Sequence, residues 1–275
     1  MKIKQKQHSK KNTIRFVAVC ILAAAAAIAT VLISIDIFMF YRDSLFVFGK
    51  SDLKGDDKPL SVKADMGYDP GDANLLTPLP AKKDEIIAYT SIPTYNQKKE
   101  GYPLGCEGVS LYMALKGKGY INYMSLQDFM DTMPKGETPY DGYMGNPCIG
   151  HEGENEGKRT SIYPEALVEW ARQYGGATDI TGASPAQLRK ELQAGHVVLV
   201  YVTGSWKKPE WKRYEWSKTE KGEVENNHCL CVVGAYGDNS FIINDCASGH
   251  LGEYRISADV FEPIYNARRF AVVIY

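Results

Sequence analysis

An almost uninterrupted apolar segment, residues 16–35, constrains this chain more than any other feature of its sequence. About 20 apolar residues are enough to cross a bilayer as a helix. The cations ahead of the segment are Lys2, Lys4, Lys6, Lys10, Lys11 and Arg15. Because cytoplasmic flanks carry the excess of cations, the pattern predicts a cytoplasmic segment at residues 1–15 and a transmembrane anchor at residues 16–40. The chain would then lie in the cell membrane as a single-pass protein with an extracytoplasmic remainder.

A cleaved signal peptide is the main alternative, since it also begins with a basic region. Against it, the alanines at residues 23–27 are followed by more apolar residues and not by a polar mature start. The apolar stretch is also longer than the usual core of a signal peptide. Cys20 raises the alternative of a lipoprotein, but this cysteine lies near the beginning of the apolar segment. The uncleaved anchor is the favoured prediction.

The composition changes after the apolar segment. Residues 55–59, 69–72 and 77–80 are rich in Gly, Pro and Asp or Thr, which are typical of turns. No periodic apolar pattern persists, so residues 41–84 are predicted to be an extracytoplasmic linker. The formal net charge of −1 gives no indication of a nucleic-acid partner.

The stretch from Gln97 to Cys106 carries the first chemical signal. Pro103 and Gly105 indicate a loop, and the apolar spacing after Cys106 predicts a helix that stops near Gly117. A helix N-terminus favours an anion, and the thiolate is the reactive form of cysteine. Cys106 is therefore a candidate nucleophile, and Gln97 could fold back to offer an amide N–H to an oxyanion. The alternative is that Cys106 is a small buried hydrophobe that caps a core helix.

A predicted hairpin near the C-terminal end supplies a base and an acid. Residues 229–234 and 241–245 have strand composition, and a turn at residues 237–239 separates them. This pairing places His228 and Asp245 on adjacent arms. A histidine oriented by a carboxylate, with a cysteine far upstream, is the order expected for papain-like catalysis. His8, His151, His196 and His250 have no acid at such a spacing, so they are weaker candidates.

These motifs together resemble the double-glycine, or bacteriocin-processing, family of papain-like cysteine peptidases. The resemblance is carried by residues 102–107, the helix that follows, Asn-His-Cys at 227–229 and Asn-Asp at 244–245. It covers roughly residues 86–275 and is closer to single-domain, membrane-anchored relatives in Gram-positive bacteria. It implies that Cys106 is the nucleophile, His228 the base, Asp245 the orienting acid and Gln97 the oxyanion-hole donor. No metal and no cofactor are expected.

The order of predicted elements gives the fold class. Helices are predicted at residues 106–117, 125–133, 164–174, 184–195 and 257–261, and strands at 86–89, 196–202, 229–234, 241–245 and 270–275. Helices first and an antiparallel sheet later favour an α+β domain, residues 85–275, with the papain-like arrangement that the resemblance implies. Residues 136–157 are polar and are predicted to be a surface loop. Residues 206–216 are predicted to be a second loop.

Four further cysteines leave alternatives open: Cys148, Cys229, Cys231 and Cys246. Cys229 and Cys246 directly follow the two site residues of the hairpin, so strand alternation predicts that both point away from the site. A disulfide between them would join the two arms, and buried free thiols are equally consistent with the sequence. A zinc site is weaker, because Cys-x-Cys at 229–231 has no second paired motif.

The predicted function is hydrolysis of peptide bonds by a membrane-anchored, extracytoplasmic cysteine peptidase. Relatives fused to export transporters cut after a Gly-Gly leader on the cytoplasmic side, which does not fit the topology predicted here. The expected partners are a peptide or protein substrate, including cell-wall peptide, and the membrane. One alternative is an amidase or endopeptidase acting on peptidoglycan stem peptides, for which Trp206, Trp211 and Trp216 are the best indication. The other is a surface binding module without activity.

Overall fold

The computed structural model describes residues 82–247 and 249–275. The predicted cytoplasmic segment and membrane anchor, and nearly all of the predicted linker, lie outside the described residues. Among the residues that are described, no helix combines the length and the apolar character needed to cross a membrane.

Helices and strands of the described residues follow the predicted order, with several short additions. The helices are α2 (Cys106–Gly117), α3 (Leu126–Asp131), α4 (Pro164–Ala171), α5 (Pro185–Gln193) and α6 (Ala258–Tyr265), with 3₁₀ turns η1 (Gly153–Asn155) and η2 (Gly204–Trp206). The strands are β1 (Ile86–Tyr89), β2 (Ala177–Asp179), β3 (Val197–Thr203), β4 (Trp211–Lys212), β5 (Glu223–Val224), β6 (Asn227–Tyr236), β7 (Phe241–Asp245), β8 (Gly252–Ile256) and β9 (Ala271–Ile274).

The main sheet is antiparallel in every pairing and is organised around the long strand β6. Its order is β2-β9-β3-β6-β7-β8, and β1 pairs with the C-terminal part of β6. Strands β6 and β7 form the predicted hairpin, with Cys231 opposite Asn244. The N-terminal part of β6 pairs with β3, where His228 lies opposite Val202. The start of β6 and the end of β7 therefore lie side by side.

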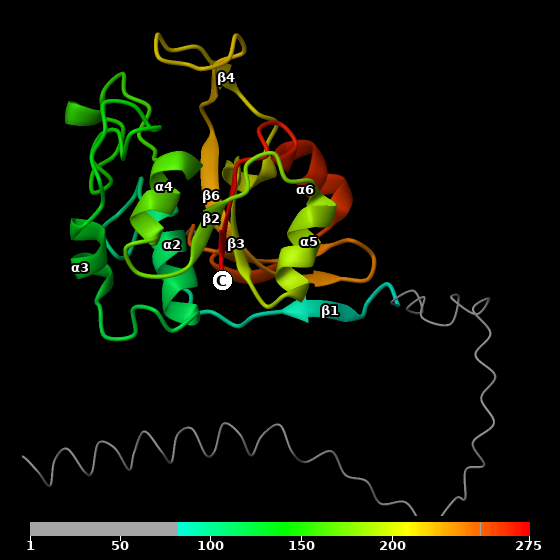
Figure 1. Cartoon of the computed structure of the whole chain (residues 1–275). Helices are drawn as coiled ribbons and strands as arrows, with labels where there is room; N and C mark the ends of the chain where they lie inside the picture. The colour runs from blue at the N-terminus through cyan, green and yellow to red at the C-terminus, as the bar shows by residue number, and fades with distance from the viewer. Residues whose placement is uncertain (1–81, 248) are drawn as a thin grey trace, which may run out of the picture. The chain divides into compact units, whose positions relative to one another are not determined.

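Side-chain alternation in the central strands builds a core on each face of this sheet. On β6, Cys229 and Cys231 belong to the cluster formed with α2, α3 and α4, whereas Leu230 and Val232 pack with α5 and α6. Figure 1 shows the same division, with the first three helices on one side of the sheet and the last two on the other. The predicted α+β class with helices on an antiparallel sheet is confirmed. The sequence did not indicate that helices would cover both faces.

The structure differs from the expected elements at several points. Helices α3 and α4 end at Asp131 and Ala171, a few residues before their predicted ends. The predicted loop at residues 206–216 contains β4, which pairs with β5 over two residues, too few to show a sequence period. The predicted surface loop at residues 136–157 buries Tyr143 completely, and its hydroxyl donates to the carbonyl of Leu104. One buried aromatic in a polar stretch has no period that would reveal it.

Candidate active site

Cys106 is the first residue of α2, as predicted. Gly105 occupies the N-cap position, and no side chain caps the helix there. A Cβ at Gly105 would lie 2.8 Å from Cβ of Tyr102, and a Cβ at Gly108 would lie 2.6 Å from Sδ of Met130. These glycines let the first turn of α2 pack closely against its surroundings. The helix is buried on all sides, as expected of a central core helix, and Cys106 itself is 8% exposed.

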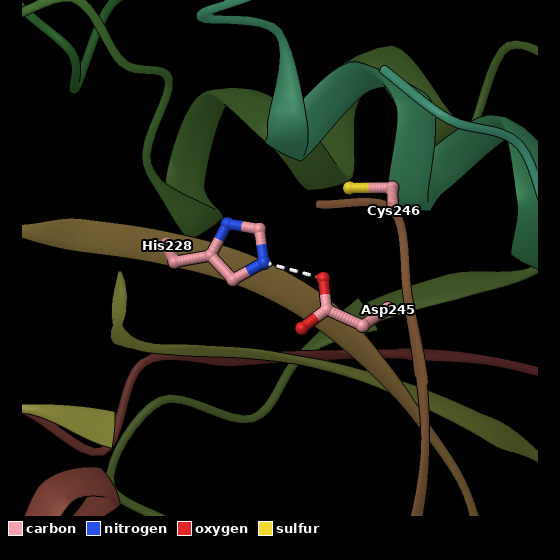
Figure 2. Close-up of side chains that lie close together, drawn as sticks. All are labelled: His228, Asp245 and Cys246. Carbon is pink, nitrogen blue, oxygen red and sulfur yellow. Dashed lines mark hydrogen bonds and ion pairs between the residues drawn. The ribbon is translucent and has the colours of Figure 1, made fainter. Parts of the chain in front are cut away.

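His228 and Asp245 form a buried hydrogen-bonded pair, as the predicted hairpin requires. Nε2 of His228 lies 2.7 Å from Oδ1 of Asp245, and both residues are buried. Figure 2 shows the two side chains facing each other, with the other ring nitrogen of His228, Nδ1, directed away from the carboxylate. Nδ1 makes no hydrogen bond within the described residues, so it is open to a reaction partner.

Further donors hold the Asp245 carboxylate. Its Oδ1 also accepts from the backbone N–H of Ala247 at 2.8 Å, and its Oδ2 accepts from the Tyr254 hydroxyl at 3.1 Å. Burial by itself would raise the pKa of Asp245, but the bonds from His228, Ala247 and Tyr254 outweigh it and lower that pKa below its usual value. Asp245 is thus placed to keep the proton of His228 on Nε2.

The Cys106 thiol hydrogen-bonds to Glu107 in this structure. Its Sγ lies 3.3 Å from Oε2 of Glu107, and no hydrogen bond joins it to His228 among the described residues. Burial, and then the Glu107 carboxyl, raise the pKa of the thiol well above its usual value, while an interaction with the backbone amide of Cys229 opposes the rise. Burial and the Glu107 carboxyl thus act in this state against the thiolate that the helix N-terminus was expected to favour, and the role of Cys106 stays a prediction. Desolvation and the adjacent acid both disfavour the charged form of the thiol.

Gln97 lies beside the same helix terminus. Its Nε2 donates to the carbonyl of Pro103 at 2.8 Å, and its Oε1 accepts from Sγ of Cys246 at 3.1 Å. Sγ of Cys246 in turn lies 3.7 Å from the carbonyl oxygen of Cys106. An amide has two hydrogens to donate, so the bond to Pro103 leaves one for another acceptor.

Cys246 and Cys229 do not lie as the sequence predicted. Asp245 is the last residue of β7, so strand alternation does not extend to Cys246, whose thiol contacts Gln97. Cys229 packs in the cluster that contains Cys106. For Cys246 the prediction fails because β7 has already ended. Cys229 does follow the alternation of β6, but the face that it reaches is the one on which α2 and Cys106 pack. Within the described residues all five cysteines are free thiols, and Cys148 is exposed.

One group of side chains has metal-ligand character. The donor atoms of His228, Asp245 and Cys246 lie within 4.8 Å of one another (Figure 2). These atoms already hydrogen-bond to one another or to Gln97. The protein's own contacts therefore account for the cluster, which is also not the four-cysteine set considered from the sequence.

A pocket of about 430 Å³ lies next to the start of α2. Its lining includes Tyr102, Met130 and Pro147, the three residues that a Cβ at Gly105 would touch. Asp131, Lys135 and Glu154 add charged groups to it. A substrate segment bound there would lie beside the Cys106 loop.

A model of the Peptidase_C39 like family matches residues 89–273. The chain belongs to this family. Family membership indicates a cysteine peptidase. A crystal structure from Bacillus anthracis, described as that of a C39-like peptidase, superposes with a TM-score of 0.58 at 22% identity, over 70% of this chain and 98% of that chain. At this identity the likeness establishes the fold. No curated protein matches the chain.

Several residues of the site were not assigned a role from the sequence. Glu107, Asn227 and Tyr254 each hydrogen-bond to a predicted site residue or to its neighbour. Glu107 and Asn227 stand next to Cys106 and His228 in sequence, which was the one available indication. Tyr254 comes from β8, a strand that the sequence did not predict.

Proposed function

We propose that this C39-like chain hydrolyses peptide bonds, with Cys106 as nucleophile, His228 as base and Asp245 as the residue that orients the base. The observation that carries the proposal is the buried 2.7 Å bond between Nε2 of His228 and Asp245, which leaves Nδ1 free. A histidine held in one tautomer by a carboxylate is the arrangement that activates a cysteine or serine nucleophile.

The reaction begins when the thiol leaves Glu107. Nδ1 of His228 takes the proton from Sγ, and the thiolate attacks the carbonyl carbon of the scissile bond. Gln97 and the backbone N–H of Cys106 donate to the resulting oxyanion. The imidazolium then gives its proton to the leaving amine, and a thioester remains. Water, deprotonated by Nδ1, releases the acid and restores the thiol.

We also propose that residues 16–40 anchor the enzyme in the cell membrane with its catalytic domain outside. The basic residues before the apolar segment support this orientation. Secreted or wall-associated peptides are then the natural substrates, and the pocket next to Gly105 would bind part of them.

Peptidoglycan stem peptides are the alternative substrate. The tryptophans that indicated this substrate lie in different environments. Trp206 donates its indole N–H to Tyr254, while Trp211 is half-buried beside Lys221. Trp206 thus supports the Asp245 carboxylate through Tyr254. Trp216 already stacks on Tyr214 with ring centroids 4.9 Å apart, and the Lys221 ammonium lies over the Trp211 ring, which weakens the indication for a glycan.

The test compares the full chain with its Cys106→Ala and His228→Ala variants on a mixed peptide library and on purified sacculi. Cleavage that both variants abolish supports the proposal, and the preferred material identifies the substrate. Binding of either material by all three proteins without any cleavage would leave the non-catalytic binding module as the better explanation.

A further inference from the structure

Glu107 is a buried carboxyl group with three donors around it. It is 1% exposed. Its Oε2 accepts from the Cys106 thiol, and its Oε1 accepts from the Ser161 hydroxyl and from Nδ2 of Asn227 at 3.3 Å. Both carboxyl oxygens of Glu107 therefore take part in hydrogen bonds. Burying such a group is costly unless it is paired, so its position next to the candidate nucleophile calls for a functional reason.

Asn227 connects this carboxyl group to the strand that carries the base. It is the first residue of β6 and directly precedes His228. Its Oδ1 accepts from Nη2 of Arg268, and this bond fixes which end of the amide faces Glu107. The Arg268 guanidinium is buried over the rings of Tyr163 and Phe270. The orientation of the Asn227 amide is therefore determined by a buried cation and not by solvent.

The consequence is a direct link between the two halves of the site. The residue after the thiol bonds to the residue before the imidazole, although the two are 120 positions apart in sequence. Other contacts also join α2 to β6: the Ser110 hydroxyl donates to the carbonyl of Cys229, and the Cys231 thiol donates to the carbonyl of Ser110. The bond between Glu107 and Asn227 differs from them because it links the immediate neighbours of Cys106 and His228. A displacement of about 1 Å between reacting groups can cost about 100-fold in rate.

We propose that Glu107 and Asn227 are positioning residues, whose hydrogen bond sets the approach of the Cys106 thiol to His228. The inference rests on the proposed function, since it assigns a purpose to the thiol–imidazole pair. Glu107 also holds the thiol in its resting orientation through Oε2. The sulfur must turn from Glu107 toward Nδ1 before the proton can move, and the link keeps the imidazole within reach during that turn.

Alkylation of Cys106 tests the link without a substrate. The rate of carbamidomethylation of Cys106 by iodoacetamide at neutral pH is measured in the full chain by mass spectrometry, with and without His228→Ala. The Asn227→Ala variant is compared in the same way. Ser161→Ala is the control, because it removes another donor to the same Glu107 oxygen, and a long 3.5 Å contact to the Asn227 amide, but leaves the bond between Asn227 and Glu107.

The expected result is a change in how strongly the alkylation rate of Cys106 depends on His228. In the parent chain, His228→Ala should slow alkylation about ten-fold, the equivalent of one pKa unit. The ratio of the alkylation rate with His228 to the rate with His228→Ala should fall close to one when Asn227→Ala is also present. With Ser161→Ala the same ratio should stay near the parent value. Glu107→Gln keeps an acceptor for Asn227 and should preserve the ratio, whereas Glu107→Ala should lose it.

Each other outcome has a definite meaning. If His228→Ala has no effect in the parent chain, the proposed catalytic pair itself fails. If the ratio is unchanged in Asn227→Ala, or lost equally in Ser161→Ala, the pair stands and the positioning role is overturned. Circular dichroism establishes that each variant is folded. Should Asn227→Ala not fold, Asn227→Gln, which displaces the amide by one methylene, replaces it with the same expected loss.

Discussion

The Tyr254 hydroxyl donates a 3.1 Å hydrogen bond to Oδ2 of Asp245, the carboxylate oxygen that His228 does not use. The same hydroxyl accepts from the indole N–H of Trp206 at 3.0 Å. A chain of hydrogen bonds therefore runs from η2 through β8 to the end of β7. It fixes the carboxylate on the side opposite to the imidazole, so that rotation of the Asp245 carboxylate would break its bonds to His228, Ala247 and Tyr254 together.

Loss of the Tyr254 hydroxyl should weaken catalysis more than folding. A hydrogen bond to a charged group contributes about 1.5–3 kcal/mol, and a rise of about 1.4 kcal/mol in the barrier is a ten-fold loss of rate. We expect Tyr254→Phe to lower kcat about ten-fold in a peptide-cleavage assay. Tyr89→Phe, which removes a surface hydroxyl bonded to Glu253, is the control and should leave kcat unchanged. Equal losses in both variants would contradict the prediction.

Asp245 should make stability depend on pH in the acid range. Its pKa is lower in the folded chain than its ordinary value, so its contribution is complete above about pH 4, the unfolded pKa. That contribution is lost as the pH falls through the folded pKa. The difference in Tm between the parent chain and Asp245→Asn should therefore be largest near neutral pH and shrink toward acid pH. A difference that stays constant down to acid pH would disprove this linkage.

The cysteines of the described residues should differ sharply in reactivity. Cys148 is exposed, whereas Cys229, Cys231 and Cys246 are fully buried, and burial raises the pKa of each of these three thiols. The thiolate is the reactive species. Alkylation of the folded chain, mapped by mass spectrometry, should modify Cys148 first and the three buried thiols only after denaturation. Early labelling of Cys231 in the native protein would contradict the packing described here.

Gly117 should be intolerant of a side chain. A Cβ there would lie 2.3 Å from Cγ2 and 3.1 Å from Cα of Ile92. Overpacking of this kind costs about 1–3 kcal/mol, so Gly117→Ala should lower the free energy of unfolding by that amount in a urea titration. Gly249→Ala is the matched control, because nothing lies within 4 Å of its added Cβ. A Gly117→Ala variant as stable as the control would count against the contact.

Removing the Gln97 amide should act on the chemical step. One side-chain donor of an oxyanion hole contributes about 10²–10³-fold to kcat. We expect Gln97→Ala to lower kcat by that factor while KM changes little, as measured by steady-state cleavage of the best library peptide. A variant in which KM alone rises would assign Gln97 to substrate binding.

Local patterns in the sequence were sufficient for much of the framework. The spacing after Cys106 predicted α2, and the turn before Phe241 predicted the hairpin that brings His228 to Asp245. The predicted helix start at Ser184 is the N-cap of α5. Each of these depends on residues close together in the chain, where helix and strand periods are directly visible.

The sequence by itself thus determined which residue types meet at the helix start and at the hairpin end. Only the tertiary structure decided how they meet. The thiol bonds to Glu107, Cys246 faces Gln97, and Asn227 reaches Glu107 from 120 positions away. These contacts follow from the packing of α2 on β6, which buries the first turn of the helix. Burial sets the protonation of a thiol and the cost of a carboxylate, and no local pattern in the chain reports it.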